Sequence, residues 1–225
     1  MFKKPLPLIA YTLFIVVISS LITTAYIHYF VVGANSGDDG APALTSISDE
    51  RIKKSPIKEE NAIVEIFSYG CHYCAINEKN VKELEAQLPP GSKLVRLHIG
   101  NPQNSGLSAY APLFATLSVM GLEDKYRESA YRAIIKERLD LSDPAQLGQW
   151  LQDNGIDRTD YRSVSQSQDV KELMAYMTAV SEYYQVNATP SFIVNKKWLA
   201  QQDSDFSTFS KKLLSLLKDD SPLEP

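Results

Sequence analysis

Thiols and imidazoles are scarce in this chain, which has only two cysteines and three histidines among 225 residues. A structural metal site needs about four ligands, most often thiolates and imidazoles. One of the histidines, His28, lies in an uncharged run near the N-terminus, which leaves only His72 and His98 beside the two cysteines. We therefore expect no metal site.

The chain also lacks a surplus of basic residues. Its 23 Lys and Arg stand against 27 Asp and Glu, for a formal net charge of −4. Because phosphate binding calls for a basic surface, we expect no nucleic-acid partner. No run of like charge is long enough for an interaction tail, and no internal repeat is visible. The 44% apolar content fits a chain that buries a core, and the length fits one domain with an additional segment or two.

Charge is absent altogether from Leu6 to Val32, a run of 27 residues with two lysines before it and two aspartates after it. About 20 apolar residues suffice to cross a bilayer as a helix. With the positive-inside tendency, residues 1–32 predict a cytoplasmic start and a single-pass transmembrane signal-anchor in the inner (cytoplasmic) membrane, with the catalytic domain in the periplasm. The alternative is a signal peptide cleaved near Ala34, although such signals have apolar stretches of only about 7–15 residues. Both interpretations predict export.

The rest of the chain divides into a linker and a folded part. Residues 33–60 are rich in Gly, Ser, Pro and charge and predict a stalk, whose second half could add an edge strand. Residues 61–220 predict one domain with the element order strand (61–69), helix (from Cys71), strand (93–100), several helices, hairpin (191–200) and helix. This order predicts an α/β domain with a helical insertion at about 105–186.

Both cysteines lie in the segment FSYGCHYCAINE, residues 67–78. A disulfide that closes so short a loop stabilises little, which argues against a structural bridge. Cys71 stands where a strand ends and a helix begins, so that free backbone N–H groups and the positive helix end favour its thiolate. Cys74 follows one turn later and is expected to be more buried, as suits the resolution of a mixed disulfide. In an exported chain, this arrangement predicts a redox pair.

A second element of interest is NATPSFIVN, in which Pro190 directly precedes an apolar strand. Proline cannot donate to a sheet ladder and therefore belongs at the first position of a strand. Its alternative role is to end a loop, and the sequence alone leaves both roles open.

Four segments in order and spacing, VEIFSYGCHYC, LPPGSKLVRLHIG, MGLEDKY and VNATPSFIVN, resemble the DsbA family of exported thiol–disulfide oxidoreductases. The resemblance covers roughly residues 61–218 and implies a thioredoxin-like fold with an inserted helical domain. It implies that Cys71 forms a mixed disulfide with clients, that Cys74 resolves this mixed disulfide, and that the peptide bond before Pro190 is cis and lies beside the two cysteines. Thr189 would hydrogen-bond the client backbone. The family's partners are exported unfolded or cysteine-containing proteins and a membrane redox partner of the DsbB kind; the two sulfurs carry the chemistry, so no cofactor is implied.

Two further positions match the family. Glu65 interrupts an apolar strand, where a buried carboxylate is costly unless it is paired. By the resemblance, Arg96 is its partner, and the pair moves protons to and from Cys74; alternatively, Glu65 faces solvent at a sheet edge. Arg96 replaces the lysine of the family and does not give up its proton, which weakens the relay. His98 shares a strand face with Arg96, and we expect it to be structural.

The dipeptide between the cysteines departs from the family, whose oxidising members have Pro-His where this chain has His72-Tyr73. This dipeptide governs the stability of the thiolate and hence the reduction potential. Tyr73 beside the second cysteine and Thr189 before Pro190 resemble the residues of the disulfide isomerases at these positions. His72 as a cation would lower the pKa of Cys71. Alternatively, His72 is simply an exposed loop residue.

The direction of exchange therefore stays open between an oxidase and an isomerase or reductase on the same fold. A different class of function, a non-catalytic anchored module that binds metal or peptide, is the remaining alternative. Exchange of the disulfide with a small thiol, as against copurification with stoichiometric metal, separates the two classes.

Overall fold

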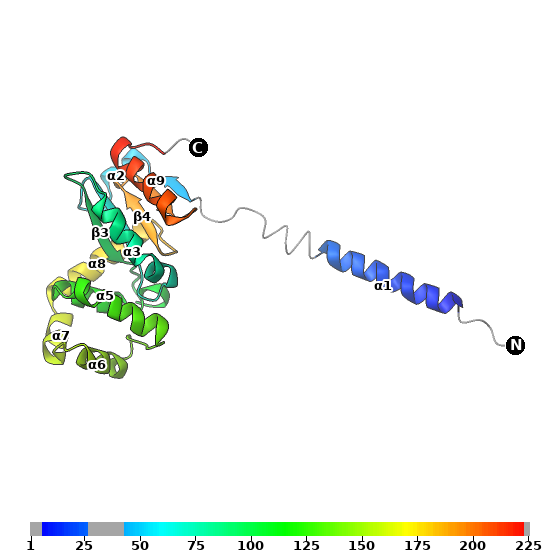
Figure 1. The fold of residues 1–225 in the computed structure, drawn as a ribbon, viewed down its shortest axis with the longest axis horizontal. Coiled ribbons are helices and arrows are strands. Elements are labelled where there is room, and N and C mark those ends of the chain that lie inside the picture. Colours follow the sequence, from blue (N-terminus) through cyan, green and yellow to red (C-terminus); the bar gives the residue numbers. More distant parts are fainter. Residues whose placement is uncertain (1–5, 27–42, 223–225) are drawn as a thin grey trace. The chain divides into compact units, whose positions relative to one another are not determined.

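The structure is a computed structural model that describes residues 6–26 and 43–222 (Figure 1). The chain forms two compact units, residues 1–42 and 43–225, which are described separately. The first contains helix α1 (Leu6–Tyr26), and the second contains the sheet and all the other described helices.

The prediction of a transmembrane signal-anchor over residues 1–32 is wrong. In the part of the chain that the structure describes, no helix has the length and apolarity of a membrane span. The prediction rested on the absence of charge from Leu6 to Val32, of which the structure describes Leu6–Tyr26 as helix α1. The predicted single-pass localisation in the inner membrane rested on the same span and is wrong with it. The alternative cleavage site near Ala34 lies outside the described residues.

The second unit is built on a five-stranded sheet with the order β1-β5-β4-β2-β3. The strands are β1 (Leu44–Ser46), β2 (Ala62–Phe67), β3 (Lys93–His98), β4 (Ser191–Val194) and β5 (Trp198–Gln201). Only β2 and β3 are parallel; the other neighbours are antiparallel. All six residues of the central strand β2 are buried, as its short apolar run predicts.

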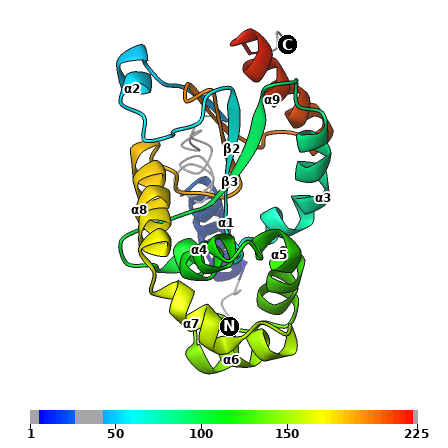
Figure 2. The same cartoon turned by 90° about the vertical axis from the view of Figure 1, so that its left-hand side faces the viewer.

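Helices cover both faces of this sheet. Figure 2 shows α3 (His72–Ala86) and α9 (Phe206–Asp219) on one side of β2 and β3, and α8 (Gln168–Tyr183) on the other. The helical insertion between β3 and β4 comprises α8 and the elements before it: η2 (Gly106–Ser108), α4 (Ala111–Val119), α5 (Glu123–Tyr131), the π-helical turn η3 (Arg132–Lys136), α6 (Pro144–Asp153) and α7 (Arg158–Ser165). The predicted α/β architecture with a helical insertion is thus confirmed.

The stretch 33–60, expected to be a stalk, contributes to the second unit where it is described. Strand β1 pairs with β5, a short helix α2 (Asp49–Lys53) follows, and Ile47 and Ile57 are buried in the core. The edge strand left open by the sequence is therefore present. The division of the chain at residues 33, 61 and 220 stays a prediction.

Two apolar clusters stabilise the domain. One joins β2, β3 and the start of α3 to the insertion, and it contains both cysteines. The other joins β2 and β4 to α3 and α9. Because side chains alternate along a strand, Ile63, Glu65 and Phe67 share one face of β2. The ring of Phe67 lies edge-on to Phe114 of α4, at 5.3 Å between centroids.

The close approach between the end of β3 and α8 requires a glycine at position 100. A Cβ added to Gly100 would lie 2.7 Å from the backbone nitrogen and 2.9 Å from the Cα of Thr178. The Gly100 N–H also donates to the Ser181 hydroxyl at 3.0 Å, which fixes the distance between the two elements.

We expect Gly100→Ala to lower the free energy of unfolding by about 1–3 kcal/mol, because overpacking forces backbone shifts. Urea denaturation measures the loss. Since the clash includes backbone atoms of Thr178, adding Thr178→Ala should not restore stability. An unchanged urea midpoint in Gly100→Ala would contradict the proposed close packing.

Candidate active site

Cys71 caps the N-terminus of α3. Its backbone is extended, at φ −93° and ψ 114°, and its Sγ accepts a hydrogen bond from the Cys74 backbone N–H at 3.2 Å. The sulfur thus takes the place that a side-chain oxygen usually has at this position. Both cysteines are free thiols; 6% of Cys71 is exposed, against 0% of Cys74. Only the first sulfur can be reached from solvent.

The two thiols differ in acidity. The pKa of Cys71 is lowered to about 6, chiefly by the hydrogen bond from the Cys74 thiol; burial opposes this, and Thr189 and the backbone N–H groups of Cys74 and Tyr73 support it. Burial raises the pKa of Cys74 far above its usual value, and the hydrogen bond to Cys71 and the charge of Cys71 raise it further. At neutral pH, the pair therefore holds a thiolate at Cys71 and a thiol at Cys74.

The loop that leads from β2 to Cys71 is held by buried polar contacts. The Ser68 hydroxyl donates to the Leu107 carbonyl at 2.6 Å, and the Tyr69 N–H donates to His98 Nε2 at 3.1 Å. Because burial lowers the pKa of His98 to about 4, the ring is neutral at neutral pH, and its Nδ1–H donates to the Ile99 carbonyl at 2.9 Å. His98 thus has the structural role expected from the sequence.

The segment before β4 lies directly beside the cysteines. The peptide between Thr189 and Pro190 is cis, as the family resemblance implies. In its protonated form, the Cys71 thiol donates to the Thr189 carbonyl, 3.2 Å from the sulfur. Residues from α3 and from the loop before Pro190 thus meet at the reactive sulfur.

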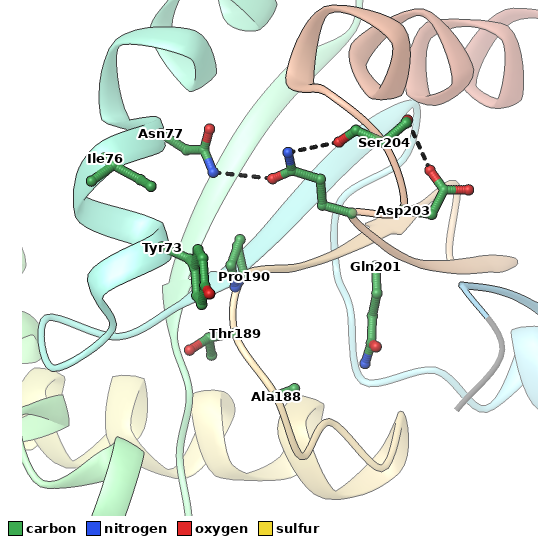
Figure 3. A pocket seen from close by; sticks show the side chains of 10 residues that line it. Tyr73, Ile76, Asn77, Ala188, Thr189, Pro190, Gln201, Asp203 and Ser204 are labelled. Atoms are coloured by element: carbon green, nitrogen blue, oxygen red, sulfur yellow. Dashed lines mark hydrogen bonds between the residues drawn. The ribbon is translucent and has the colours of Figure 1, made fainter. Parts of the chain in front are cut away.

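A groove of about 620 Å³ opens next to this junction (Figure 3). Tyr73 and Ile76 line one side and are 67% and 58% exposed, and Pro190 lies opposite Tyr73. Beyond them the wall is polar, since Asn77 Nδ2 donates to Gln202 Oε1 at 3.0 Å. The groove therefore offers apolar contacts close to Cys71 and amide groups farther away.

Glu65 and Arg96 form a buried ion pair on this side of the sheet. Arg96 Nε lies 2.7 Å from Glu65 Oε2, outside hydrogen-bond alignment, and Glu65 is 0% exposed. The alternative of a solvent-facing Glu65 is therefore wrong. Burial raises the pKa of Glu65, although Arg96 opposes the shift. Arg96 also donates both terminal N–H groups to Glu78 on α3, at 2.7 and 2.9 Å.

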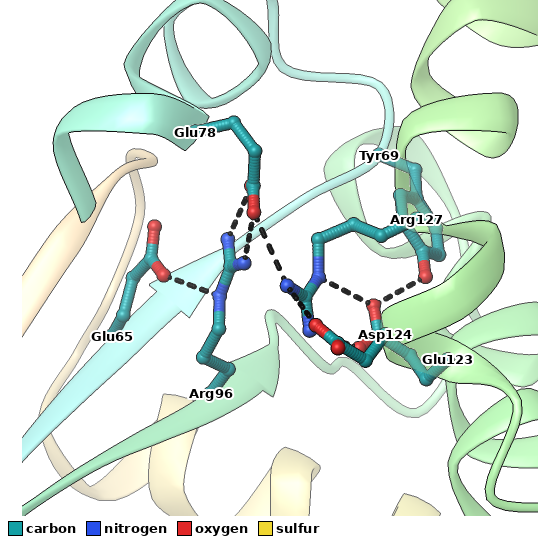
Figure 4. Close-up of polar contacts among 7 residues, drawn as sticks. All are labelled: Glu65, Tyr69, Glu78, Arg96, Glu123, Asp124 and Arg127. Carbon is teal, nitrogen blue, oxygen red and sulfur yellow. Dashed lines mark hydrogen bonds and ion pairs between the residues drawn. The ribbon is translucent and has the colours of Figure 1, made fainter. Parts of the chain in front are cut away.

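This pair is one end of a longer chain of charges (Figure 4). Arg127 on α5 donates to Glu78 at 3.2 Å and forms a two-armed pair with Glu123, whose Oε1 also accepts the Tyr69 hydroxyl at 2.7 Å. Arg127 reaches the exposed Asp124 as well, at 3.0 Å. The chain thus links the central strand to the active-site helix and to the insertion.

The sequence located only part of this site. The structure brings Cys71, Cys74, Thr189 and Pro190 together, places Tyr73 in the groove, and leaves His72 exposed with its ring 6.1 Å from that of Tyr73. Five residues of the charge chain were missed, namely Tyr69, Glu78, Glu123, Asp124 and Arg127. Glu78 follows Cys74 by four positions and could have been found on that helical face. The residues of α5 gave no local signal.

Among the residues that the structure describes, no three His, Cys, Asp or Glu side chains are grouped so that they could hold a metal ion. The interpretation of the chain as a metal-binding module thus has no support in this part of the structure.

Residues 80–213 match the family of DSBA-like thioredoxin domains. The Thiol:disulfide interchange protein DsbA of Pseudomonas aeruginosa is 30% identical over 138 residues, which are 60% of this chain and 64% of that protein. The protein of the same name from Bordetella pertussis is 27% identical over 160 residues, or 71% of this chain and 74% of that protein. The match thus spans slightly less than two thirds of the Pseudomonas relative.

Solved structures agree in fold. The crystal structure of Pseudomonas aeruginosa DsbA superposes with a TM-score of 0.69 at 24% identity and covers 82% of this chain and 96% of that one. The DsbA disulfide interchange protein of Klebsiella pneumoniae gives 0.62 at 23% identity, covering 81% and 97%. The predicted thioredoxin-like fold with a helical insertion is therefore confirmed.

We expect the rate of alkylation of Cys71 by iodoacetamide to rise through a midpoint near pH 6, because only the thiolate reacts. Cys74→Ala should move this midpoint upward, since the hydrogen bond from the Cys74 thiol makes the largest contribution to the shift. Cys74 itself should stay unlabelled in the folded wild-type protein. Equal labelling of both cysteines, or an unmoved midpoint in the variant, would contradict the assignment.

The neutral His98 predicts a loss of stability in acid. The unfolded chain binds a proton below about pH 6.5, whereas the folded chain does not do so until about pH 4. Stability is therefore complete above pH 6.5 and falls as the pH drops toward 4, by roughly 3 kcal/mol for this group. Urea unfolding at intervals from pH 7 to pH 4.5 measures the slope. His98→Gln should lower the slope by about one proton; an identical slope would show that His98 is not responsible.

Proposed function

Because the chain belongs to the family of DSBA-like thioredoxin domains, we propose that it is a thiol–disulfide oxidoreductase that acts through Cys71 and Cys74 on exported, cysteine-containing proteins. The observation that carries this proposal is the asymmetry of the pair. Cys71 is reachable and its pKa is lowered to about 6, whereas Cys74 is buried and its pKa is raised. One sulfur is thus suited to exchange with clients and the other to resolution.

In the oxidising direction, a client thiolate attacks the Sγ of Cys71 in the Cys71–Cys74 disulfide. The bond between the two protein sulfurs breaks, and Cys74 leaves as a thiolate that takes up a proton. A second client thiolate then attacks the client sulfur of the mixed disulfide, and Cys71 leaves as a thiolate. The client loses two electrons, and the protein gains them.

The acidity of Cys71 favours this direction. A stabilised thiolate lowers the free energy of the reduced protein and makes the disulfide more oxidising. The lowered pKa therefore supports an oxidase over a reductase. A membrane redox partner of the DsbB kind would return the pair to the disulfide, by resemblance to the family.

The groove supports a role in client binding. Thr189 offers its backbone next to Cys71, and the exposed side chains of Tyr73 and Ile76 offer apolar surface within the same groove. A client segment lying there would present its cysteine to the only reachable sulfur of the pair.

The proposal is tested by trapping. A single-cysteine peptide, oxidised to its disulfide-linked dimer, is offered to the reduced full-length protein, and mixed disulfides are counted by non-reducing electrophoresis and mass spectrometry. Cys74→Ala should accumulate the peptide on Cys71, because no second thiol releases it; Cys71→Ala should accumulate none. The wild-type protein should turn the peptide over with little intermediate. If Cys74→Ala forms no adduct, the chain does not exchange disulfides.

A further inference from the structure

Tyr131, the last residue of α5, has a buried hydroxyl group without a hydrogen-bond partner. Only 5% of the residue is exposed, and no acceptor or donor lies within hydrogen-bond geometry of its Oη. Buried hydroxyls in proteins are normally paired, so each exception calls for an explanation. The nearby Tyr69 shows the usual case, since its hydroxyl donates to Glu123 at 2.7 Å.

The position of Tyr131 relates it to the cysteine pair. Its ring lies edge-on to Tyr69 at 5.3 Å between centroids and 6.2 Å from Phe67, on the face of β2 that also carries Glu65. Arg127 lies one turn before Tyr131 on α5 and contacts Glu78 of α3. Cys74 lies one turn before Glu78 on α3. The Tyr131 ring and both cysteines belong to one apolar cluster.

The charges around Tyr131 agree with this placement. Burial raises the pKa of its phenol far above the usual value, and the negative charges of Cys74 and then Glu65 raise it further. The group therefore remains protonated throughout the neutral range, which makes it a hydrogen-bond donor. In the dithiol form seen here, the Tyr131 hydroxyl is not hydrogen-bonded to the Cys74 sulfur, so a bond between them has to form when Cys74 becomes a thiolate.

The backbone is unusual at the same place. Directly after Tyr131, α5 continues as the π-helical turn η3, in which Glu137 N–H bonds to the Arg132 carbonyl at 3.1 Å. Such turns are rare in helices and frequent at functional sites.

We propose that the Tyr131 hydroxyl stabilises the thiolate of Cys74 that forms each time the Cys71–Cys74 disulfide opens or closes. When a client thiolate bonds to Cys71 and the disulfide breaks, the electron pair of the broken bond stays on Cys74. Tyr131 donates a hydrogen bond to this sulfur and keeps its own proton. The thiolate then takes up a proton by the route that the family resemblance assigns to Glu65. This inference rests on the proposed function and adds a residue to it.

The proposal makes a specific kinetic prediction for Tyr131→Phe, which removes only the hydroxyl. A donor that acts on the thiolate alone stabilises the transition states of opening and closing but neither the disulfide nor the thiol. Both rates should therefore fall by the same factor, at least about tenfold for a hydrogen bond to a charged group. The equilibrium between the two forms, and hence the reduction potential, should stay unchanged.

The experiment uses the full-length protein with glutathione as the probe. Rapid acid quenching and mass spectrometry resolve two kinds of step. Opening of the disulfide by reduced glutathione, and closing of the Cys71–glutathione mixed disulfide, both involve Cys74. Attack of the Cys71 thiolate on oxidised glutathione does not. Tyr161→Phe is the matched control, because Tyr161 on α7 is a buried tyrosine of the same apolar cluster, whose phenol is hydrogen-bonded to Thr116 and is not affected by either cysteine. The rates of this variant should equal those of the wild type.

We expect Tyr131→Phe to slow opening and closing of the disulfide by one common factor. The attack of Cys71 on oxidised glutathione and the reduction potential should stay unchanged. Tyr131→Phe rates within twofold of the wild type would overturn the proposal. Equal slowing of all steps, or a changed melting temperature with a changed potential, would also overturn it, since these point to a structural role. If the wild-type protein forms no mixed disulfide with glutathione, the proposed function itself fails, which is a result distinct from an unaffected variant.

Discussion

The chemistry of the site depends on the unequal burial of its two cysteines. Cys74 is 0% exposed, and its thiol acts on Cys71, whose pKa is lowered to about 6. The same contact that lowers the pKa of one thiol raises the pKa of the other. Burial of Cys74 by α3, the sheet and the insertion is thus the reason why Cys71 is reactive at neutral pH. At the helix N-terminus, the backbone N–H groups of Cys74 and Tyr73 lower the pKa of Cys71 further.

The buried charged groups beneath the two cysteines help to set the pKa of Glu65. Arg96 and Arg127 are held by Glu78 and Glu123, two carboxylates for two guanidinium groups. Although burial acts against it, the hydrogen bonds and charges of the two arginines keep the pKa of Glu78 below its usual value. Glu65 is then a third carboxyl group beside two guanidinium groups. Its raised pKa follows chiefly from burial and is supported by the charge of Glu78, whereas Arg96 and Arg127 oppose it.

The sequence indicated the parts of this arrangement that are local. Cys71 at a strand–helix junction, the apolar β2 and the insertion between β3 and β4 could all be read from patterns within a few residues. The contact of Arg127 with Glu78 joins positions 49 apart, and that of Asn77 with Gln202 joins positions 125 apart, so neither has a local signature. The prediction of a membrane span rested on the absence of charge alone and was wrong. The short β1 was ambiguous because its three residues are ordered by pairing with β5 and not by their own pattern.

The arginine at position 96 changes what the buried pair can do. A lysine could release its proton, whereas the guanidinium group of an arginine stays charged. The two terminal nitrogens of Arg96 donate to Glu78, and its Nε faces Glu65. In this chain, Arg96 therefore orients its neighbours, and Glu65 is left as the one member of the pair that can gain or lose a proton. A protonated carboxyl can supply the proton that Cys74 needs, whereas an ionised carboxylate repels the thiolate. When Glu65 is ionised, the thiolate needs a donor that does not itself ionise, and a phenol of strongly raised pKa meets this requirement.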